Sequence, residues 1–256
     1  MRPLYLKGAG IQVTQDGPAL KITQAGHADG WFPLQRVSRV ISSPRVHWTT
    51  EALIACARTG ISISFQDDDG GVVARLVGQP GEREEIRQRL ADFLLRARWQ
   101  EAYQQWLTAM EAMAVRSVAR RAHWPDSLPQ TPRELRQWLK TTVVSLDLQT
   151  QEAAASQQLQ GLLMAYVTQH LSQAGIGLEL SGRTEPDLTG DLTRILWWDF
   201  RLALLNWLRS QNAQLRPPDP PAVIAFFEHR EARTESLCCG LLNRLHVWLI
   251  DQYSWR

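Results

Sequence analysis

Acidic residues that stand close together are the first candidates for chemistry in this chain. Asp67, Asp68 and Asp69 precede two glycines, and crowded carboxylates are common ligands of Ca²⁺. A calcium loop, however, places its acids at alternate positions and closes on a glutamate, and this run has neither feature. The run therefore predicts the turn of a solvated β-hairpin.

Histidines and cysteines near the C-terminal end form a second candidate site. His229, Cys238, Cys239 and His246 do not have the spacing of a zinc site, so we expect them to pack within helices. Ser236 could pair with His229 as in a hydrolase, but no nucleophile elbow surrounds it. Three cysteines are also a poor framework for disulfides.

Arginine is the third candidate, because 25 of the 28 basic residues are arginines and the planar guanidinium suits phosphate groups. The net charge of +2 gives no global field that would indicate nucleic acid, and a GC-rich coding sequence is an alternative source of the bias. From the residues alone, a duplex-binding stripe and a solvated face neutralised by nearby acids both stay open. The stripe would comprise Arg83, Arg87, Arg98, Arg116, Arg120 and Arg121.

The elements that must position these groups fall into two parts. Up to residue 78 the chain shows short alternating runs separated by turn signals, with one short helix expected at residues 52–58 after Thr49. A strand is expected to continue through residues 32–41. These patterns predict a small β-sandwich-like domain over residues 1–78.

From residue 82 onward the pattern is helical. One continuous apolar face is expected to run through Ile86, Leu90, Phe93, Leu94, Ala97 and Tyr103. Further helices are expected at residues 133–144, 150–173, 192–212 and 233–251, with residues 217–221 as a stiff proline-rich connector. The fold class is therefore α+β: the β domain, followed by a larger all-α domain over residues 79–256.

The order of these segments resembles the family of the CRISPR-associated spacer integrase, the metal-dependent nuclease-integrase of spacer acquisition. The resemblance covers residues 1–205. Its clearest segments are Gly60-Ile61 before a strand, Arg98 at a place usually held by lysine, Ala174-Gly175-Ile176, and Trp198-Asp199-Phe200-Arg201, which is similar to the family's Glu-Pro-Phe-Arg. The resemblance implies a β domain that forms a homodimer and an α domain that holds the active site.

The resemblance also implies a set of metal ligands, which this chain largely lacks. The family uses a glutamate, a histidine and an aspartate to hold Mg²⁺ or Mn²⁺ for transesterification. Glu152 matches the glutamate, but the aspartate position falls on Ile195 and its companion glutamate on Trp198. No histidine lies between residues 177 and 189, where the third ligand is expected. We therefore expect a degenerate site with no metal cofactor, filled by apolar side chains that include Trp197.

An alternative is an active endonuclease-integrase with Mg²⁺ or Mn²⁺ in a rebuilt site. Glu152 would be joined by Glu179 or Glu185 in place of the histidine, and by Asp191 or Asp199 in place of the aspartate. The competing interpretation is that these acids are loop residues and helix caps, as Asp187 and Asp191 before the 192–212 helix suggest.

The resulting hypothesis is a non-catalytic subunit of a CRISPR adaptation complex that binds duplex DNA. Expected partners are a second copy of the chain and the small adaptation subunit or a catalytic paralogue; a protein scaffold without DNA binding is a further alternative. No signal peptide is evident and no apolar run reaches about 18 residues, so a cytoplasmic protein is expected. The residues expected to contact DNA are Arg75, Arg87, Arg98, Arg116, Arg120, Arg121, Arg183 and Arg201.

Overall fold

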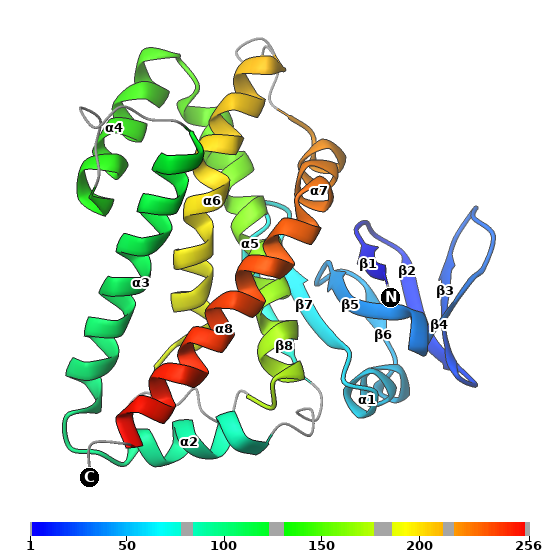
Figure 1. Cartoon of the computed structure of the whole chain (residues 1–256). Helices are drawn as coiled ribbons and strands as arrows, with labels where there is room; N and C mark the ends of the chain where they lie inside the picture. The colour runs from blue at the N-terminus through cyan, green and yellow to red at the C-terminus, as the bar shows by residue number, and fades with distance from the viewer. Residues whose placement is uncertain (1, 78–83, 123–130, 177–185, 212–217, 254–256) are drawn as a thin grey trace.

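A computed structural model describes residues 2–77, 84–122, 131–176, 186–211 and 218–253 (Figure 1). The N-terminal part contains two four-stranded sheets. The first has the order β1 (Arg2–Leu6), β5 (Val37–Ser42), β7 (Ser62–Gln66) and β8 (Val72–Leu76), with only the β7–β8 pair antiparallel. The second has the order β4 (Gly30–Pro33), β3 (Ala19–Gln24), β2 (Ile11–Asp16) and β6 (His47–Trp48).

The two sheets share one apolar core. Alternating residues of β2 and β5, such as Val13 and Val40, are fully buried in it, together with Ala52 and Cys56 of helix α1 (Thr50–Arg58). Thr49 caps α1 as expected, accepting a hydrogen bond from the Ala52 backbone N–H. This two-sheet region followed by helices confirms the predicted α+β class with a sandwich-like N-terminal part.

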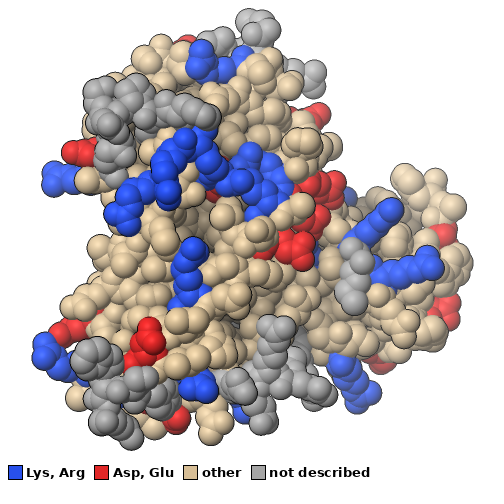
Figure 2. Space-filling view, in the orientation of Figure 1, with Lys and Arg blue, Asp and Glu red and all other residues tan. Residues whose placement is uncertain are grey.

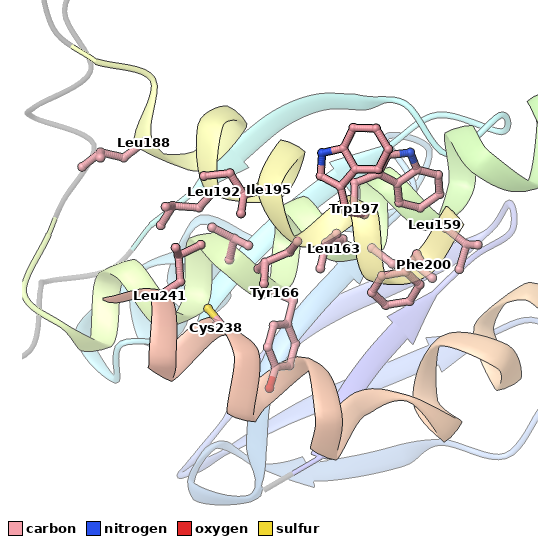
Figure 3. Packing of buried hydrophobic residues seen from close by; sticks show 14 of the residues in the cluster. Leu159, Leu163, Tyr166, Leu188, Leu192, Ile195, Trp197, Phe200, Cys238 and Leu241 are labelled. Atoms are coloured by element: carbon pink, nitrogen blue, oxygen red, sulfur yellow. The ribbon is translucent and has the colours of Figure 1, made fainter. Parts of the chain in front are cut away.

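The C-terminal part is helical. Its elements are α2 (Glu84–Leu94), α3 (Trp99–Arg121), α4 (Pro132–Ser145), α5 (Gln149–Gln173), α6 (Leu188–Ser210), α7 (Pro220–His229) and α8 (Glu231–Tyr253). The central helix, α5, packs against α6, α7 and α8 and against strands β5 and β7. Figure 3 shows how Leu163 and Tyr166 of α5 meet apolar side chains of α6 and α8 in this core. No helix in the described ranges is long and apolar enough to cross a membrane.

Three sequence predictions about the elements were wrong. The face expected to run from residue 86 to 103 breaks between α2 and α3, because the chain turns at residues 95–98 and leaves Ala97 exposed. Arg96 fixes this corner by donating a hydrogen bond to the Gln252 carbonyl of α8 (2.8 Å). The strand expected over residues 32–41 is interrupted by a 3₁₀ turn, Leu34–Arg36.

The third wrong prediction is the proline-rich connector expected over residues 217–221, because helix α7 already begins at Pro220. Asp219 caps this helix by accepting from the Ala222 backbone N–H (2.9 Å), and Pro220 and Pro221 occupy its first turn. Prolines are well tolerated there because the first-turn N–H groups have no partner inside the helix. A cap followed by prolines was thus a helix start and not only a connector.

The β-sheet and the helices meet along α5. Gly161 of α5 faces the carbonyl of Gly70 in the β7–β8 turn so closely that a Cβ on Gly161 would lie 2.0 Å from that oxygen. Arg39 of β5 is 2% exposed and donates from Nη1 to Glu231 Oε1 (2.9 Å) and Gln169 Oε1 (3.4 Å). A close backbone approach and a partly buried ion pair therefore join the two parts.

Candidate functional site

Glu152, the residue that matches the family's glutamate, lies in the first turn of α5. Its Oε1 accepts a hydrogen bond from Ser156 Oγ (2.7 Å), and the residue is half-buried. Arg201 of α6 is close enough for the Glu152 charge to act on it. Burial lowers the pKa of Arg201, Glu152 opposes this change, and Arg136 adds to it. A guanidinium thus already provides Glu152 with a cationic neighbour.

Trp198 occupies the position of the companion glutamate. It is 3% exposed, and its indole Nε1 donates to Glu111 Oε1 (3.1 Å). The guanidiniums of Arg201 and Arg136 lie 4.8 Å and 5.7 Å from its ring, and Arg136 also pairs with Glu111 (3.7 Å). Two arginines and one glutamate therefore contact this buried indole, so there is no excess negative charge around it that would attract a divalent cation.

Ile195, at the position of the family's aspartate, is buried with Trp197 in the main core (Figure 3). Each large apolar side chain buried in this way contributes about 1.5–3 kcal/mol to folding. A charged carboxylate at this position would have to be desolvated among these side chains, at considerable cost. The local environment therefore suits an apolar residue and not a metal ligand.

The described acids considered for a rebuilt site, Asp191 and Asp199, are bound by other partners. Asp191 accepts hydrogen bonds from Tyr103 Oη and Arg194 Nη2, both at 3.0 Å, and burial raises the pKa of this carboxyl. It precedes Arg201 by ten residues on α6, which is about 15 Å along the axis, and Arg201 is the residue beside Glu152. Asp187 caps α6 by accepting from Gly190.

Glu179 and Glu185, the other candidates for a rebuilt site, lie outside the described residues. Within the described ranges, no group of three or more His, Cys, Asp or Glu side chains is placed to hold a metal ion. Of the family's three ligand positions, the structure describes those of Glu152 and Ile195. They do not fit a divalent cation, because Ile195 is buried and apolar and Glu152 is left as a single carboxylate.

A cluster of charged side chains is centred on Asp199, whose side chain is 5% exposed. Arg233 of α8 binds this carboxylate through two nitrogens, with Nε 2.9 Å from Oδ2 and Nη2 2.9 Å from Oδ1. Arg121 of α3 pairs with Oδ1 at 2.5 Å, and Arg230 pairs with Oδ2. One buried carboxylate therefore gathers three arginines from α3 and from the junction of α7 and α8.

A pocket of about 200 Å³ opens beside this cluster, between α3, α6 and α8. Arg120, Arg121 and Arg244 line it together with Asp199, so cations outnumber the carboxylate in its wall. Figure 2 shows a band of Lys and Arg side chains across this face of the helices, where the end of α3 approaches the start of α8. The other lining residues are Met110, Met113, Ala114, Ser117, Val118, Ile195, Leu196, Leu237 and Leu241.

The arginines expected to contact DNA do not form one stripe. Arg116, Arg120 and Arg121 are exposed together on α3, whereas Arg87 is exposed on α2. Arg98 is also exposed, but it is paired with Glu101 at 2.5 Å.

Two others are partly buried or bound: Arg75 is half-buried and donates to Thr168 Oγ1 of α5 (3.3 Å), and Arg201 is half-buried on Trp198. Arg183, and Arg83 of the expected stripe, lie outside the described residues. Sequence reasoning missed Arg230, Arg233 and Arg244. Asp199 was the signal that could have indicated these arginines. It is one acid inside an apolar helix, and a buried charge needs partners of opposite charge.

Comparison with known proteins agrees with this arrangement of elements. A family model described as CRISPR associated protein Cas1 matches residues 4–164. A CAS1 protein from Thermotoga maritima has a similar structure, with a TM-score of 0.69 and 12% identity over 97% of each chain. No curated protein matches the sequence.

Two further structures are similar at low identity. A casposase bound to its integration product gives a TM-score of 0.68 at 12% identity, covering 98% of this chain and 91% of the other. TtCas1 in complex with DNA gives 0.55 at 14% identity, with the same coverage. At these identities the likeness establishes a shared fold.

Proposed function

Because this chain belongs to the Cas1 family of CRISPR-associated proteins, we propose that it serves in CRISPR adaptation as a non-catalytic subunit that binds duplex DNA. The observation that carries the non-catalytic role is the burial of Ile195 and Trp198 at two positions where the family has acids.

DNA binding is supported by the arginines of α3 and α8 that share one face (Figure 2). Arg116, Arg120 and Arg121 are exposed on consecutive turns of α3, and Arg244 is exposed on α8. Phosphate contacts of this kind release counterions, so affinity falls steeply as salt rises. Two of the similar structures are a casposase bound to an integration product and a TtCas1–DNA complex, which agrees with this role.

We further propose that the N-terminal part pairs with a second copy of the chain, and that the assembly includes the small adaptation subunit or a catalytic paralogue. Strand β4 supports an interface, because it is an edge strand and carries the exposed side chains of Trp31 and Phe32. Exposed edge strands with large apolar side chains commonly pair with another chain.

The experiment combines a strand-transfer and cleavage assay in Mn²⁺ with a DNA-binding titration at two salt concentrations, using short duplexes. We expect salt-dependent binding without turnover. Mn²⁺-dependent turnover that disappears in Glu152→Ala but persists in the neighbouring Gln151→Ala would overturn the non-catalytic role. Binding that is absent, or that does not change with salt, would overturn the DNA-binding role.

A further inference from the structure

The arginine cluster beside the pocket depends on Asp199. Asp199 stands where the family's Glu-Pro-Phe-Arg has proline, a residue that cannot bind a guanidinium. We propose that the pocket beside Asp199 binds the end of a nucleic-acid strand that carries a terminal phosphomonoester. This inference rests on the proposed DNA-binding role and assigns to it one site and one chemical group.

The charges of the pocket favour an anion with more than one negative charge. Its wall holds three arginines and one carboxylate, and Arg230 and Arg233 bind that same carboxylate from the α8 side. Of the acids on neighbouring turns, Glu231 is paired with Arg39, and Glu235 acts on Tyr166 and His170 of α5. The excess positive charge is therefore left for a ligand.

A terminal phosphomonoester fits this excess better than an internal phosphodiester. Near pH 7 it carries about −1.5 to −2 charges, whereas each phosphodiester of DNA carries about one. Arginine binds phosphate through paired N–H donors, which adds directional strength to the attraction. Arg120 and Arg244 form no ion pair within the part of the chain that the structure describes, and both are exposed at the pocket's rim.

Asp199 acts in this site as a positioning residue. Arg233 uses two of its five N–H donors on the carboxylate, and Arg230 also donates to the Asp199 backbone carbonyl (3.1 Å). Without this anchor, three guanidiniums in close proximity would repel one another. The buried carboxylate holds them in one place while leaving other donors available.

The size and apolar wall of the pocket suit a strand end. About 200 Å³ is below the roughly 300–1,000 Å³ of pockets for drug-sized ligands. Neither a duplex nor a whole nucleotide can be enclosed, but the phosphate and adjoining sugar of a strand end can enter. Met110, Met113, Leu237 and Leu241 supply an apolar wall against which the terminal base or sugar can rest.

The test uses hairpin DNA with a single open blunt end and a fluorophore in the loop. Three versions carry a 5′-phosphate, a 3′-phosphate or hydroxyls only at the open end, and binding is measured by fluorescence anisotropy at one salt concentration. We expect one phosphorylated end to bind at least about tenfold more tightly than the hydroxyl end, because charge-assisted hydrogen bonds to phosphate are gained. The comparison of the two phosphorylated ends identifies the strand polarity.

Variants connect this preference to the pocket. Arg120→Gln/Arg244→Gln, at two exposed positions, should abolish it, whereas Arg116→Gln, which lies on α3 outside the pocket, should retain it. Asp199→Asn removes a negative charge, so an effect of charge alone would strengthen the preference. Loss of the preference in a folded Asp199→Asn protein would instead support positioning, and a strengthened preference would overturn it.

The outcomes separate this inference from the proposed function. Salt-dependent binding of all three hairpins with equal affinity would overturn the end site and leave the DNA-binding role intact. An end preference that survives in Arg120→Gln/Arg244→Gln would also overturn the assignment of the site. Failure of the unmodified protein to bind any hairpin would overturn both.

Discussion

One methyl group added at Gly161 should disturb the junction between the β-sheet and the helices. Its Cβ would lie 2.0 Å from the Gly70 carbonyl oxygen and 3.2 Å from Gln66 Nε2. Gly70 cannot easily move away, because it has a φ of +87° and already lies against the backbone of Gln158. The β7–β8 turn and α5 would have to separate by roughly 1.4 Å, the difference between 2.0 Å and the 3.4 Å at which ordinary contact begins.

The magnitude follows from two opposing effects. Alanine in a helix interior is about 1 kcal/mol more favourable than glycine, whereas overpacking typically costs about 1–3 kcal/mol and sometimes more. Since the clash here is with backbone, which cannot rotate away as a side chain does, the upper part of that range applies. We expect Gly161→Ala to lower the free energy of unfolding by about 2 kcal/mol or more.

Gly240 of α8 provides the matched control, because a Cβ there would meet only Arg244 Nη1, at 3.9 Å. Gly240→Ala should raise the free energy of unfolding by about 0.5–1 kcal/mol. Urea unfolding followed by far-ultraviolet circular dichroism gives both values from the midpoints and slopes. If Gly161→Ala unfolds at the same urea concentration as Gly240→Ala or at a higher one, the close approach of Gly70 and Gly161 is refuted.

Three other changes give distinct results. Asp199→Ala leaves three arginines without their shared carboxylate, and since truncating one partner of a buried ion pair is strongly destabilising, we expect a loss of about 3 kcal/mol in urea unfolding; an unchanged midpoint would contradict the cluster. Burial lowers the pKa of His170 below its ordinary 6.5, so the unfolded chain binds more protons and stability should fall as the pH drops below about 6.5. His170→Gln should flatten that part of a melting-temperature profile, and a profile identical to that of the unmodified protein would argue against it. Trp31→Ser/Phe32→Ser should convert a dimer to a monomer in sedimentation equilibrium without lowering the melting temperature of the monomer, and an unchanged mass would exclude β4 as the interface.

Features with a local signal could be predicted from the sequence. Thr49 marks a helix start that the structure reproduces. The helix expected from residue 133 begins at Pro132, after a capping box formed by Thr131 and Glu134. Asp67 accepts a hydrogen bond from the Gly71 backbone N–H (2.6 Å) within the predicted hairpin turn. Each of these features depends on residues only a few positions apart, so the interacting residues can be recognised together in the sequence.

Features that depend on distant residues could not be predicted. The corner between α2 and α3 is fixed by a hydrogen bond from Arg96 to the Gln252 carbonyl, 156 residues away. The helical spacing of apolar residues continues through this corner in the sequence and gives no sign of the turn. Asp199 was visible as one acid in an apolar helix, but its partner Arg121 lies on another helix. Only the packing of α3 and α8 against α6 brings these arginines to one carboxylate.

The junction of α7 and α8 fixes the rotation of α8 about its axis. Arg230 and Arg233 point to Asp199, while Glu231 between them binds Arg39 of the β-sheet. Successive residues of a helix are about 100° apart. One residue inserted between Arg230 and Glu231 would therefore rotate Glu231 and Arg233 together relative to Arg230, and the three side chains could not all keep their partners. Insertions and deletions should therefore be tolerated far less at this junction than in surface loops. Three neighbouring side chains, Arg230, Glu231 and Arg233, set the rotation of α8 relative to the sheet.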